Sequence, residues 1–285
     1  MRRVEVPGAG TFLAADGVEA ASIAEALREH RESRGPERAL KRDPKRRVTR
    51  VALRARVPGA PGGEAAVEAV VKERRLPLRW VLAHRLGVPS RFAGVPRIAE
   101  RIAAAGLDVP RVLAASSRVS GASDYAIVEY VEGLSLAALV WKGPARLRDR
   151  GEALGLLRAA GGWARALHES GIWERDLRGD NVIVRREPGA GPRFALVDFD
   201  GVRFLRPPLS LRRRARNLAQ LADLPAEFGA EAEPALLEGY LASGPPLIAD
   251  RLRASTSAAL AAIRRRRERR TGYAYAGGRP PAGRP

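Results

Sequence analysis

Three oxygen-bearing side chains stand at a spacing that suits phosphoryl transfer. Asp176 and Asn181 lie five residues apart in the segment WERDLRGDN, and Asp198 begins the triplet DFD twenty-two residues after Asp176. Phosphoryl transfer requires a carboxylate that orients the attacking hydroxyl, together with oxygen ligands for Mg²⁺, of which a protein usually supplies only a few. Asp176 can provide the first, and Asn181 with Asp198 the second. The pattern therefore predicts a magnesium-dependent phosphotransferase site.

The elements around these residues explain how they could meet. The apolar spacing predicts a helix over 150–170 that ends at Gly171, and short apolar strands over Val182–Arg185 and Phe194–Val197 around a Gly/Pro turn. Asp176 and Asn181 then lie in the loop before the first strand, and Asp198 directly follows the second. A hairpin of this kind brings the ends of its two strands together.

The preceding half of the chain reads as mostly strand. Strand character within 37–56, the turn Pro58–Gly63 and the apolar run Ala65–Lys72 predict a hairpin. A helix is expected over 90–105 with Gly106 as its cap, followed by strands over Val109–Leu113 and Tyr125–Val131. Further helices are expected over 134–141 and 210–242.

This order predicts an α+β fold with two lobes. The expected parts are an N-terminal extension over 1–36 with a short helix at 19–32, a strand-rich lobe over 37–133, a helical lobe over 134–262, and a basic, disordered tail over 263–285. The tail is assigned to disorder because it is rich in Arg, Gly and Pro and poor in apolar residues.

The composition narrows the class of protein. Lys and Arg number 51 against 32 Asp and Glu, a net charge of +19, which favours a polyanionic partner such as a nucleotide or an acidic membrane surface. GC-rich coding that favours arginine is an alternative source of this charge. The chain has no cysteine and its three histidines are scattered, so disulfides and a zinc site are not expected. We also expect no membrane-spanning helix and no secretory signal.

Several segments resemble the lipopolysaccharide kinase family of the protein-kinase-like fold. LHESGIWERDLRGDNVIV is similar to the family's catalytic loop and LVDFDGVRF to its metal-binding motif. LKRDPKRRVTRV resembles its opening hairpin, GLDVPRVLA the segment after its helix, and RRRARNLAQL and LLEGYL its C-terminal helices. The resemblance covers about residues 37–242. It implies ATP-dependent phosphorylation of a lipopolysaccharide core sugar, Kdo or heptose.

The resemblance also implies roles for individual residues. Asp176 would orient the sugar hydroxyl and accept its proton, and Asn181 and Asp198 would bind Mg²⁺. Lys72 would bind the α- and β-phosphates of ATP, as a compact point charge in a chain that otherwise uses arginine almost everywhere. A surface lysine at a strand end is the alternative for Lys72.

Four further residues complete the expected nucleotide site. Glu100, on the helix after Lys72, is the candidate ion-pair partner of that lysine, unless it is only a solvated carboxylate. The backbone at Glu129 and Val131 would hydrogen-bond the adenine. Lys45 would assist phosphate binding by charge, because the hairpin lacks the glycine-rich loop whose backbone amides cradle phosphates in other kinases.

Two departures from the kinase pattern leave alternatives open. Glu174 stands two residues before Asp176, where kinases usually have histidine, and Asp200 replaces the glycine of the metal motif. An ATP-binding pseudokinase with a scaffolding role is therefore one alternative, and another small-molecule or RIO-type kinase is a second. Asp200 is either a second metal or substrate contact or a cap for the segment that follows.

The basic segments 38–56 and Arg264–Arg270 suggest where the protein acts. They are candidates for contact with an anionic membrane surface, since each basic residue near such a surface contributes about 1 kcal/mol. A solvated tail is the alternative. We expect a cytoplasmic protein, peripheral at the inner face of the inner membrane, with ATP and a sugar or glycolipid as partners. No nucleic-acid partner is expected, because no recognition motif is evident.

Overall fold

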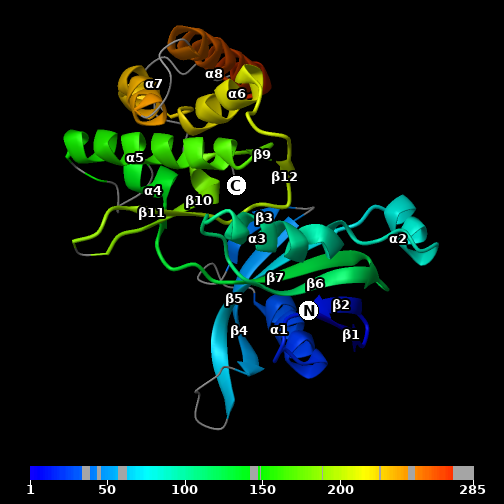
Figure 1. Ribbon diagram of the computed structural model, residues 1–285. Helices are drawn as coiled ribbons and strands as arrows, with labels where there is room; N and C mark the ends of the chain where they lie inside the picture. The colour runs from blue at the N-terminus through cyan, green and yellow to red at the C-terminus, as the bar shows by residue number, and fades with distance from the viewer. Residues whose placement is uncertain are drawn as a thin grey trace. The chain divides into compact units, whose positions relative to one another are not determined.

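The protein is described here by a computed structural model (Figure 1). It describes residues 1–33, 39–43, 46–56, 63–141, 147, 149–187, 189–224, 226–242 and 248–271. The chain forms two compact units. Unit 1 comprises Met1–Ala104 and Val109–Val131, and unit 2 comprises Ala105–Asp108 and Glu132–Pro285.

Unit 1 is built on a seven-stranded antiparallel sheet with the strand order β1-β2-β6-β7-β5-β4-β3. Its strands are β1 (Arg2–Val6), β2 (Gly10–Ala14), β3 (Ala39–Asp43), β4 (Arg46–Arg56), β5 (Glu64–Arg75), β6 (Val112–Val119) and β7 (Ser123–Glu129). Its helices are α1 (Ala20–Glu32), α2 (Leu78–Arg85), the 3-10 helix η2 (Arg91–Gly94) and α3 (Val95–Ala104). The predicted hairpin is confirmed as β4 and β5, which pair along their whole lengths from Arg46 opposite Arg74 to Arg56 opposite Glu64.

Helix α1 covers one face of this sheet. Its Ile23 and Leu27 are buried in a core that also holds Val71 of β5 and Tyr125 of β7. Because successive side chains of a strand point to opposite faces, Lys72 lies on the face of β5 that α1 does not cover. The expected phosphate-binding lysine is therefore kept out of the apolar core of unit 1.

The second face carries the segment that leads into α3. Tyr125 of β7 points into the core that α1 covers, and its neighbour Asp124 points to the opposite face of the sheet. Asp124 therefore shares a sheet face with Lys72. Ser90, which precedes η2, donates a hydrogen bond from Oγ to Asp124 Oδ1 at 2.6 Å and accepts one from the N–H of Phe92 at 2.9 Å. Figure 1 shows α1 and α3 on opposite sides of the sheet. Helix α3 and Lys72 thus belong to the same side of unit 1.

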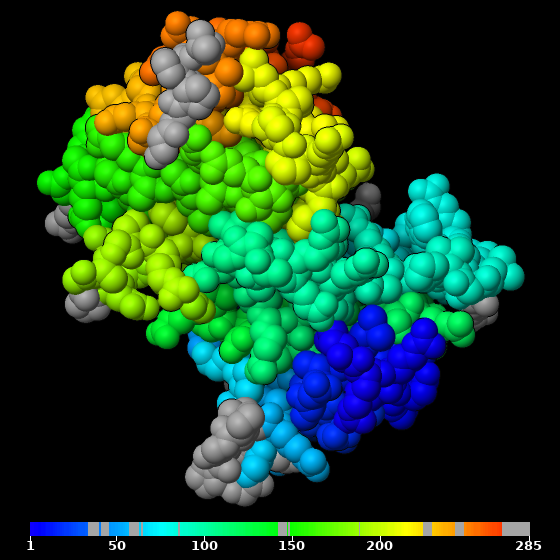
Figure 2. Space-filling view, viewed as in Figure 1, coloured from blue at the N-terminus to red at the C-terminus, as the bar shows by residue number. Residues whose placement is uncertain are grey.

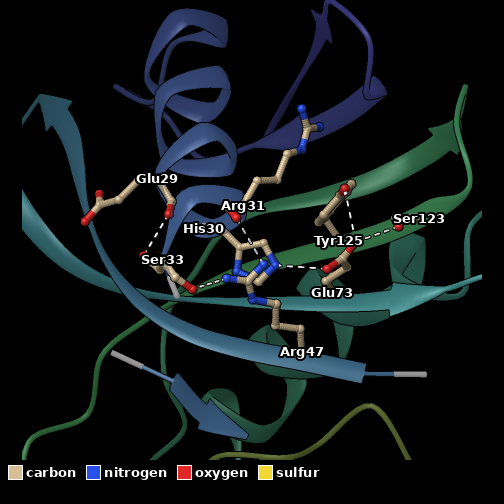
Figure 3. Close-up of polar contacts among 8 residues, drawn as sticks. All are labelled: Glu29, His30, Arg31, Ser33, Arg47, Glu73, Ser123 and Tyr125. Carbon is tan, nitrogen blue, oxygen red and sulfur yellow. Dashed lines mark hydrogen bonds and ion pairs between the residues drawn. The ribbon is translucent and has the colours of Figure 1, made fainter. Parts of the chain in front are cut away.

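Polar contacts join the end of α1 to the strand that carries Lys72 (Figure 3). His30 Nε2 lies 3.2 Å from Glu73 Oε2, and the Ser123 hydroxyl donates to Glu73 Oε1 at 2.6 Å. The hydrogen bond with His30 lowers the pKa of Glu73 to about 2, with a further contribution from Ser123 and against the effect of burial. Arg47 of β4 donates to the backbone oxygen of Ser33 just after α1. These bonds fix the end of α1 to the neighbours of Lys72.

Helix α2 is the least buried helix of unit 1. Its apolar side chains and those of the turn after it face solvent, with exposures of 74% for Leu78, 42% for Trp80, 49% for Leu82, 87% for Leu86 and 39% for Val88. Figure 2 shows α2, in cyan, standing out from the surface of unit 1. This helix was not expected from the sequence.

Unit 2 is mainly helical. Its helices are α4 (Leu136–Val140), α5 (Arg150–Glu169), α6 (Leu211–Leu221), α7 (Ala226–Leu241) and α8 (Ala249–Thr271), with the 3-10 helix η3 (Gly179–Asn181). Its strands are β8 (Leu134–Ser135), β9 (Ile172–Glu174), β10 (Val182–Arg185), β11 (Arg193–Leu196) and β12 (Val202–Phe204). They form a sheet of β11, β10 and β8 and a ribbon of β12 and β9. The α+β class is confirmed.

Glycines allow the close approach of α5 and α7. A Cβ at Gly161 would lie 2.1 Å from the backbone oxygen of Leu236, and a Cβ at Gly239 would lie 1.8 Å from that of Arg158. Real Cβ atoms do not approach an oxygen this closely, so each position requires glycine.

Asp149 caps the start of α5 by accepting from the N–H of Glu152 at 2.7 Å.

The structure differs from the sequence-based expectation at both ends of the chain. Residues 1–36 were expected to be an extension, but β1 and β2 join the sheet of unit 1 through β6. Disorder was expected from residue 263, but α8 continues to Thr271. Arginine is a good helix former, and the buried Leu252, Thr256 and Leu260 hold one face of α8 against the unit. Residues 272–285 lie outside the described residues.

Candidate functional site

Hydrogen bonds to backbone oxygens in unit 2 bring together the three residues predicted to do the chemistry. Asn181 Nδ2 donates to the backbone oxygen of Asp176 at 2.9 Å, which closes the loop between them. The N–H of Val197 donates to the backbone oxygen of Asn181 at 3.0 Å, continuing the β10–β11 pairing in which Val182 lies opposite Leu196. Asp198 follows Val197 directly. The loop carboxylate, the amide and the second carboxylate therefore lie at one end of the hairpin.

The buried side chain of Glu174 holds this loop through a hydrogen bond. Its Oε1 accepts from the N–H of Asp176 at 3.0 Å, and its side chain is buried. A Cβ at Gly201, the residue after the DFD triplet, would lie 2.5 Å from the same Oε1. Glycine at 201 thus leaves the room that the Glu174 carboxyl fills between the loop of Asp176 and the segment after Asp198. Support of loop geometry is the role expected of the histidine that Glu174 replaces.

The region around Glu174 is strongly acidic. Burial raises the pKa of Glu174 to about 7, and the negative charges of Asp200, Asp198 and Asp176 add to this effect, while the N–H of Asp176 opposes it. A cluster of carboxylates attracts a divalent cation, whose charge offsets theirs. In the described part of the chain, no group of three or more His, Asp or Glu is arranged to hold a metal by itself. Asn181 and Asp198 fit the few-ligand mode of Mg²⁺, which also uses phosphate oxygens and water.

Arg178 forms an ion pair with the candidate catalytic carboxylate. Its Nη2 lies 2.8 Å from Asp176 Oδ2, and both side chains are about half exposed. The N–H of Arg178 also donates to the backbone oxygen of Asp176 at 2.9 Å. Sequence reasoning did not single out Arg178, although its position two residues after Asp176 places it on the same turn of the loop.

A buried chain of hydrogen bonds anchors the loop to the helices behind it. Asn217 Nδ2 donates to the backbone oxygen of Glu174 at 2.6 Å and to Gln220 Oε1 at 2.9 Å. The amide oxygen of Asn217 can only accept, so His168 Nε2 donates to Asn217 Oδ1, 3.2 Å away. His168 Nδ1 then accepts from the Tyr240 hydroxyl at 3.0 Å. This chain of hydrogen bonds is made by neutral His168 that carries its proton on Nε2. It links helices α5, α6 and α7 to the loop of Asp176.

We expect His168 to make the stability of unit 2 depend on pH. Burial lowers the pKa of His168 from 6.5 to about 4. Because the unfolded chain binds this proton more readily, stability is present above pH 6.5 and is lost as the pH falls toward 4. The expected loss between pH 7 and pH 5 is about 2 kcal/mol, measured by urea unfolding.

The variant His168→Gln removes the titrating group and should flatten this slope, although it also lowers stability at pH 7. Tyr240→Phe is the matched control, since it removes one hydrogen bond of His168 but leaves the imidazole buried. An unchanged slope in His168→Gln would assign the pH dependence to other groups.

The remaining predicted site residues belong to unit 1. Lys72 is half-buried on β5, opposite Ala126 of β7 and Val48 of β4. Glu100 is exposed on α3. Their pairing stays a prediction, as do all the roles assigned to individual site residues. Lys45 lies outside the described residues.

The segment expected to contact adenine ends the sheet of unit 1. The N–H of Glu129 donates to the backbone oxygen of Arg111 at 2.9 Å, and that of Tyr130 donates to Glu68 at 2.8 Å. Among the residues that the structure describes, none accepts from the N–H of Val131. A hydrogen bond from this N–H to adenine stays a prediction.

Comparison with known proteins gives the following matches. The model of the family described as lipopolysaccharide kinase (Kdo/WaaP) matches residues 78–240, more than half of the chain. The chain is similar to WaaP in complex with acyl carrier protein, at 17% identity over 94% of this chain and 99% of that one, with a TM-score of 0.45. It is also similar to a mutant kinase domain of PknI from Mycobacterium tuberculosis, at 20% identity over 79% of this chain and 87% of that one, with a TM-score of 0.38. No curated protein matches the sequence. The range matched by the family model contains Asp176, Asn181 and Asp198 and ends before α8.

Proposed function

This chain belongs to the lipopolysaccharide kinase (Kdo/WaaP) family, and from that premise we propose how its residues phosphorylate a sugar of the lipopolysaccharide core. It is a kinase with the protein-kinase-like α+β fold. The proposed reaction transfers the γ-phosphoryl group of ATP to a hydroxyl of Kdo or heptose. The observation that supports it is the hydrogen-bonded end of the β10–β11 hairpin, which joins a loop carboxylate to two oxygen ligands within unit 2.

Asp176 is proposed to act on the acceptor hydroxyl. Its carboxylate accepts a hydrogen bond from the hydroxyl and so directs the oxygen lone pair at the γ-phosphorus. The new bond from the sugar oxygen to phosphorus forms as the bond to the ADP oxygen breaks, and the hydroxyl proton passes to Asp176. Arg178, paired with Asp176 at 2.8 Å, holds the carboxylate in place and adds positive charge beside the transferred group.

Asn181 and Asp198 are proposed to hold Mg²⁺. Bound Mg²⁺ would neutralise phosphate charge and orient the phosphates. The amide of Asn181 is suited to this because its nitrogen is committed to the backbone of Asp176, so that its oxygen is the atom left for a cation. Glu174 holds the loop by accepting the hydrogen bond from the N–H of Asp176, and its carboxyl fills the space that glycine at 201 leaves.

Residues of unit 1 are proposed to bind the rest of ATP. Lys72 binds the α- and β-phosphates from the sheet face that α1 does not cover, and Glu100, on the helix of that same side, pairs with it. The backbone of Glu129 and the N–H of Val131 bind the adenine. Lys45 adds charge near the phosphates.

The test is a transfer assay with the purified full chain, ATP, Mg²⁺ and a deacylated lipopolysaccharide core extract. We expect mass spectrometry to find one added phosphate on a core sugar and ADP in equal amount. ATP binding without transfer to any core sugar would contradict the proposed activity and favour a pseudokinase.

We also propose that the protein works as a peripheral protein at the inner face of the inner membrane, where a lipid-held acceptor would be met. Among the described residues, none of the helices has the length and apolar character to cross a bilayer. The exposed apolar side chains of α2 lie among exposed arginines, including Arg75 and Arg79. Apolar side chains with Trp and flanking arginines are typical of a surface that enters the headgroup region of anionic lipid.

The membrane proposal predicts that Leu78→Ser with Leu82→Ser lowers partitioning onto anionic vesicles by about tenfold, since each exposed leucine loses apolar area that lipid would bury. Co-sedimentation with phosphatidylglycerol vesicles measures this, beside neutral phosphatidylcholine vesicles. Leu40→Ser is the matched control, because Leu40 is an exposed leucine of β3 at 54% exposure. Equal binding by the double variant and the control would remove α2 from the membrane contact.

A further inference from the structure

A cavity of about 550 Å³ opens beside Asp176 within unit 2. It is lined by Asp176, Arg178, Gln220, Asp223, Ile263, Arg266 and Arg267. These residues come from the catalytic loop, from α6 and the turn after it, and from the last turns of α8. The volume lies in the range of small-molecule sites and is sufficient for a sugar ring. We call it the acceptor cavity.

The wall that α8 contributes follows from helix geometry. Ile263, Arg266 and Arg267 stand at i, i+3 and i+4, and therefore share one face of the helix. The same face is buried further up at Leu260 and Thr256. Arg265 belongs to another face of the helix and does not line the cavity, although both it and Arg266 are exposed. Of the arginines in Arg264–Arg270, the geometry of α8 therefore places Arg266 and Arg267 against the cavity.

The charges of the lining are only partly balanced. Arg178 pairs with Asp176, and Arg267 pairs with Asp223, whose side chain is only 3% exposed. Arg266 has no ion-pair or hydrogen-bond partner within the part of the chain that the structure describes. Three arginines against two aspartates leave one positive charge in a cavity next to the reactive carboxylate.

The position of this charge is fixed relative to Asp176. Gln220 of α6 holds the loop on both sides of Asp176, since its Nε2 donates to the backbone oxygen of Arg175 at 2.8 Å and its Oε1 accepts from the N–H of Leu177 at 3.3 Å. The pair of Asp223 and Arg267 in turn joins α8 to the end of α6. An anion bound at Arg266 would therefore sit at a defined place relative to the carboxylate that orients the hydroxyl.

We propose that the acceptor cavity binds the sugar substrate and that Arg266 recognises an anionic group on it, a carboxylate or a phosphate. A guanidinium binds either group through two parallel hydrogen bonds, so the anion sets the orientation in which a hydroxyl meets Asp176. The substrate class is therefore an acidic sugar rather than a neutral one. This inference rests on the proposed kinase function, and it assigns acceptor specificity to α8, which lies beyond the segment that the family model matches.

The test compares Arg266→Gln with Arg265→Gln. Both variants lose one positive charge from the same helix, but only the first changes the cavity. Transfer is measured with a Kdo-containing acceptor, a phosphate-bearing core sugar and an uncharged core sugar. We expect Arg266→Gln to lower kcat/KM for the acidic acceptors relative to the uncharged one by about tenfold, the effect of one charge-assisted contact, mainly through KM. Arg265→Gln should leave this ratio unchanged. The acidic acceptor that suffers the larger loss identifies the anion as carboxylate or phosphate.

A binding measurement separates failure of this inference from failure of the proposed function. Calorimetric titration of Kdo, glucose 6-phosphate and glucose, without ATP, reports on the cavity alone. Weaker binding of an acid to Arg266→Gln, but not to Arg265→Gln, supports the inference even if the wild-type protein transfers no phosphate. Equal behaviour of the two variants in both measurements overturns it, even if the wild-type protein proves to be an active kinase. Absence of acid binding by the wild-type protein also overturns it.

Discussion

Replacing Asp176 with asparagine is expected to lower kcat for phosphate transfer by about 10²- to 10⁴-fold, the usual contribution of a positioned acid–base group. The amide has almost the size of the carboxylate, but it cannot take the proton of the acceptor hydroxyl. It also cannot form the ion pair with Arg178 that the carboxylate makes at 2.8 Å. Because Asp176 is not a proposed ATP ligand, the dissociation constant for ATP should stay close to that of the wild-type protein.

The measurement is initial-rate transfer to a core sugar, with ATP affinity determined by calorimetry on the same preparation. Asp180→Asn is the matched control, since it makes the same chemical change four residues later at an exposed position of the same loop. If Asp176→Asn kept most of its activity, the carboxylate would have no part in the proton transfer. If both variants lost activity equally, the effect would belong to the loop as a whole.

Replacing Asp198 with asparagine is expected to remove the dependence of nucleotide binding on Mg²⁺. The amide keeps one oxygen but loses the negative charge that makes the end of the β10–β11 hairpin attractive to a cation. We expect ATP affinity in the presence of Mg²⁺ to fall by at least about tenfold, and ATP affinity in EDTA to change little, because magnesium–phosphate contacts carry the difference.

Calorimetric titration of ATP with Mg²⁺ and with EDTA measures both quantities without any need for turnover. Asp180→Asn again serves as the control, because it removes one negative charge close to the site without touching a proposed ligand. Unchanged affinity for magnesium-ATP in Asp198→Asn would exclude this residue as a metal ligand. A fall of the same size in EDTA would instead point to a general loss of structure.

The arrangement of the candidate site was largely predictable because its parts are close in sequence. Asp176 and Asn181 share one loop, and Asp198 follows the second strand of a short hairpin, so local pairing of β10 and β11 is sufficient to bring them together. The same holds for the β4–β5 hairpin with Lys72 and for α1, whose buried Ile23, Leu27 and His30 follow helical spacing. Periodicity and turn residues report such contacts directly.

Several features of the site could not be predicted from local sequence patterns. His168 and Asn217 were not linked to Glu174 by any local pattern, since 49 residues separate the first two and 43 the second pair. The tract at Arg264–Arg270 read as a solvated tail, because its composition is polar throughout. Its helical structure depends on packing against α6, and such packing between distant segments leaves no apolar periodicity in a tract of six arginines and one glutamate.

The sequence alone therefore determined which residues form the candidate site: a carboxylate, an amide and a second carboxylate at the spacing expected of a phosphotransferase loop and its metal motif. Only the tertiary structure decided how that loop is supported and which arginines reach it. The physical reason is that Glu174 takes its supporting role from burial beside Gly201, and Arg266 its place from the pairing of α8 with α6. Both depend on contacts between segments whose order along the chain does not predict their distance in space.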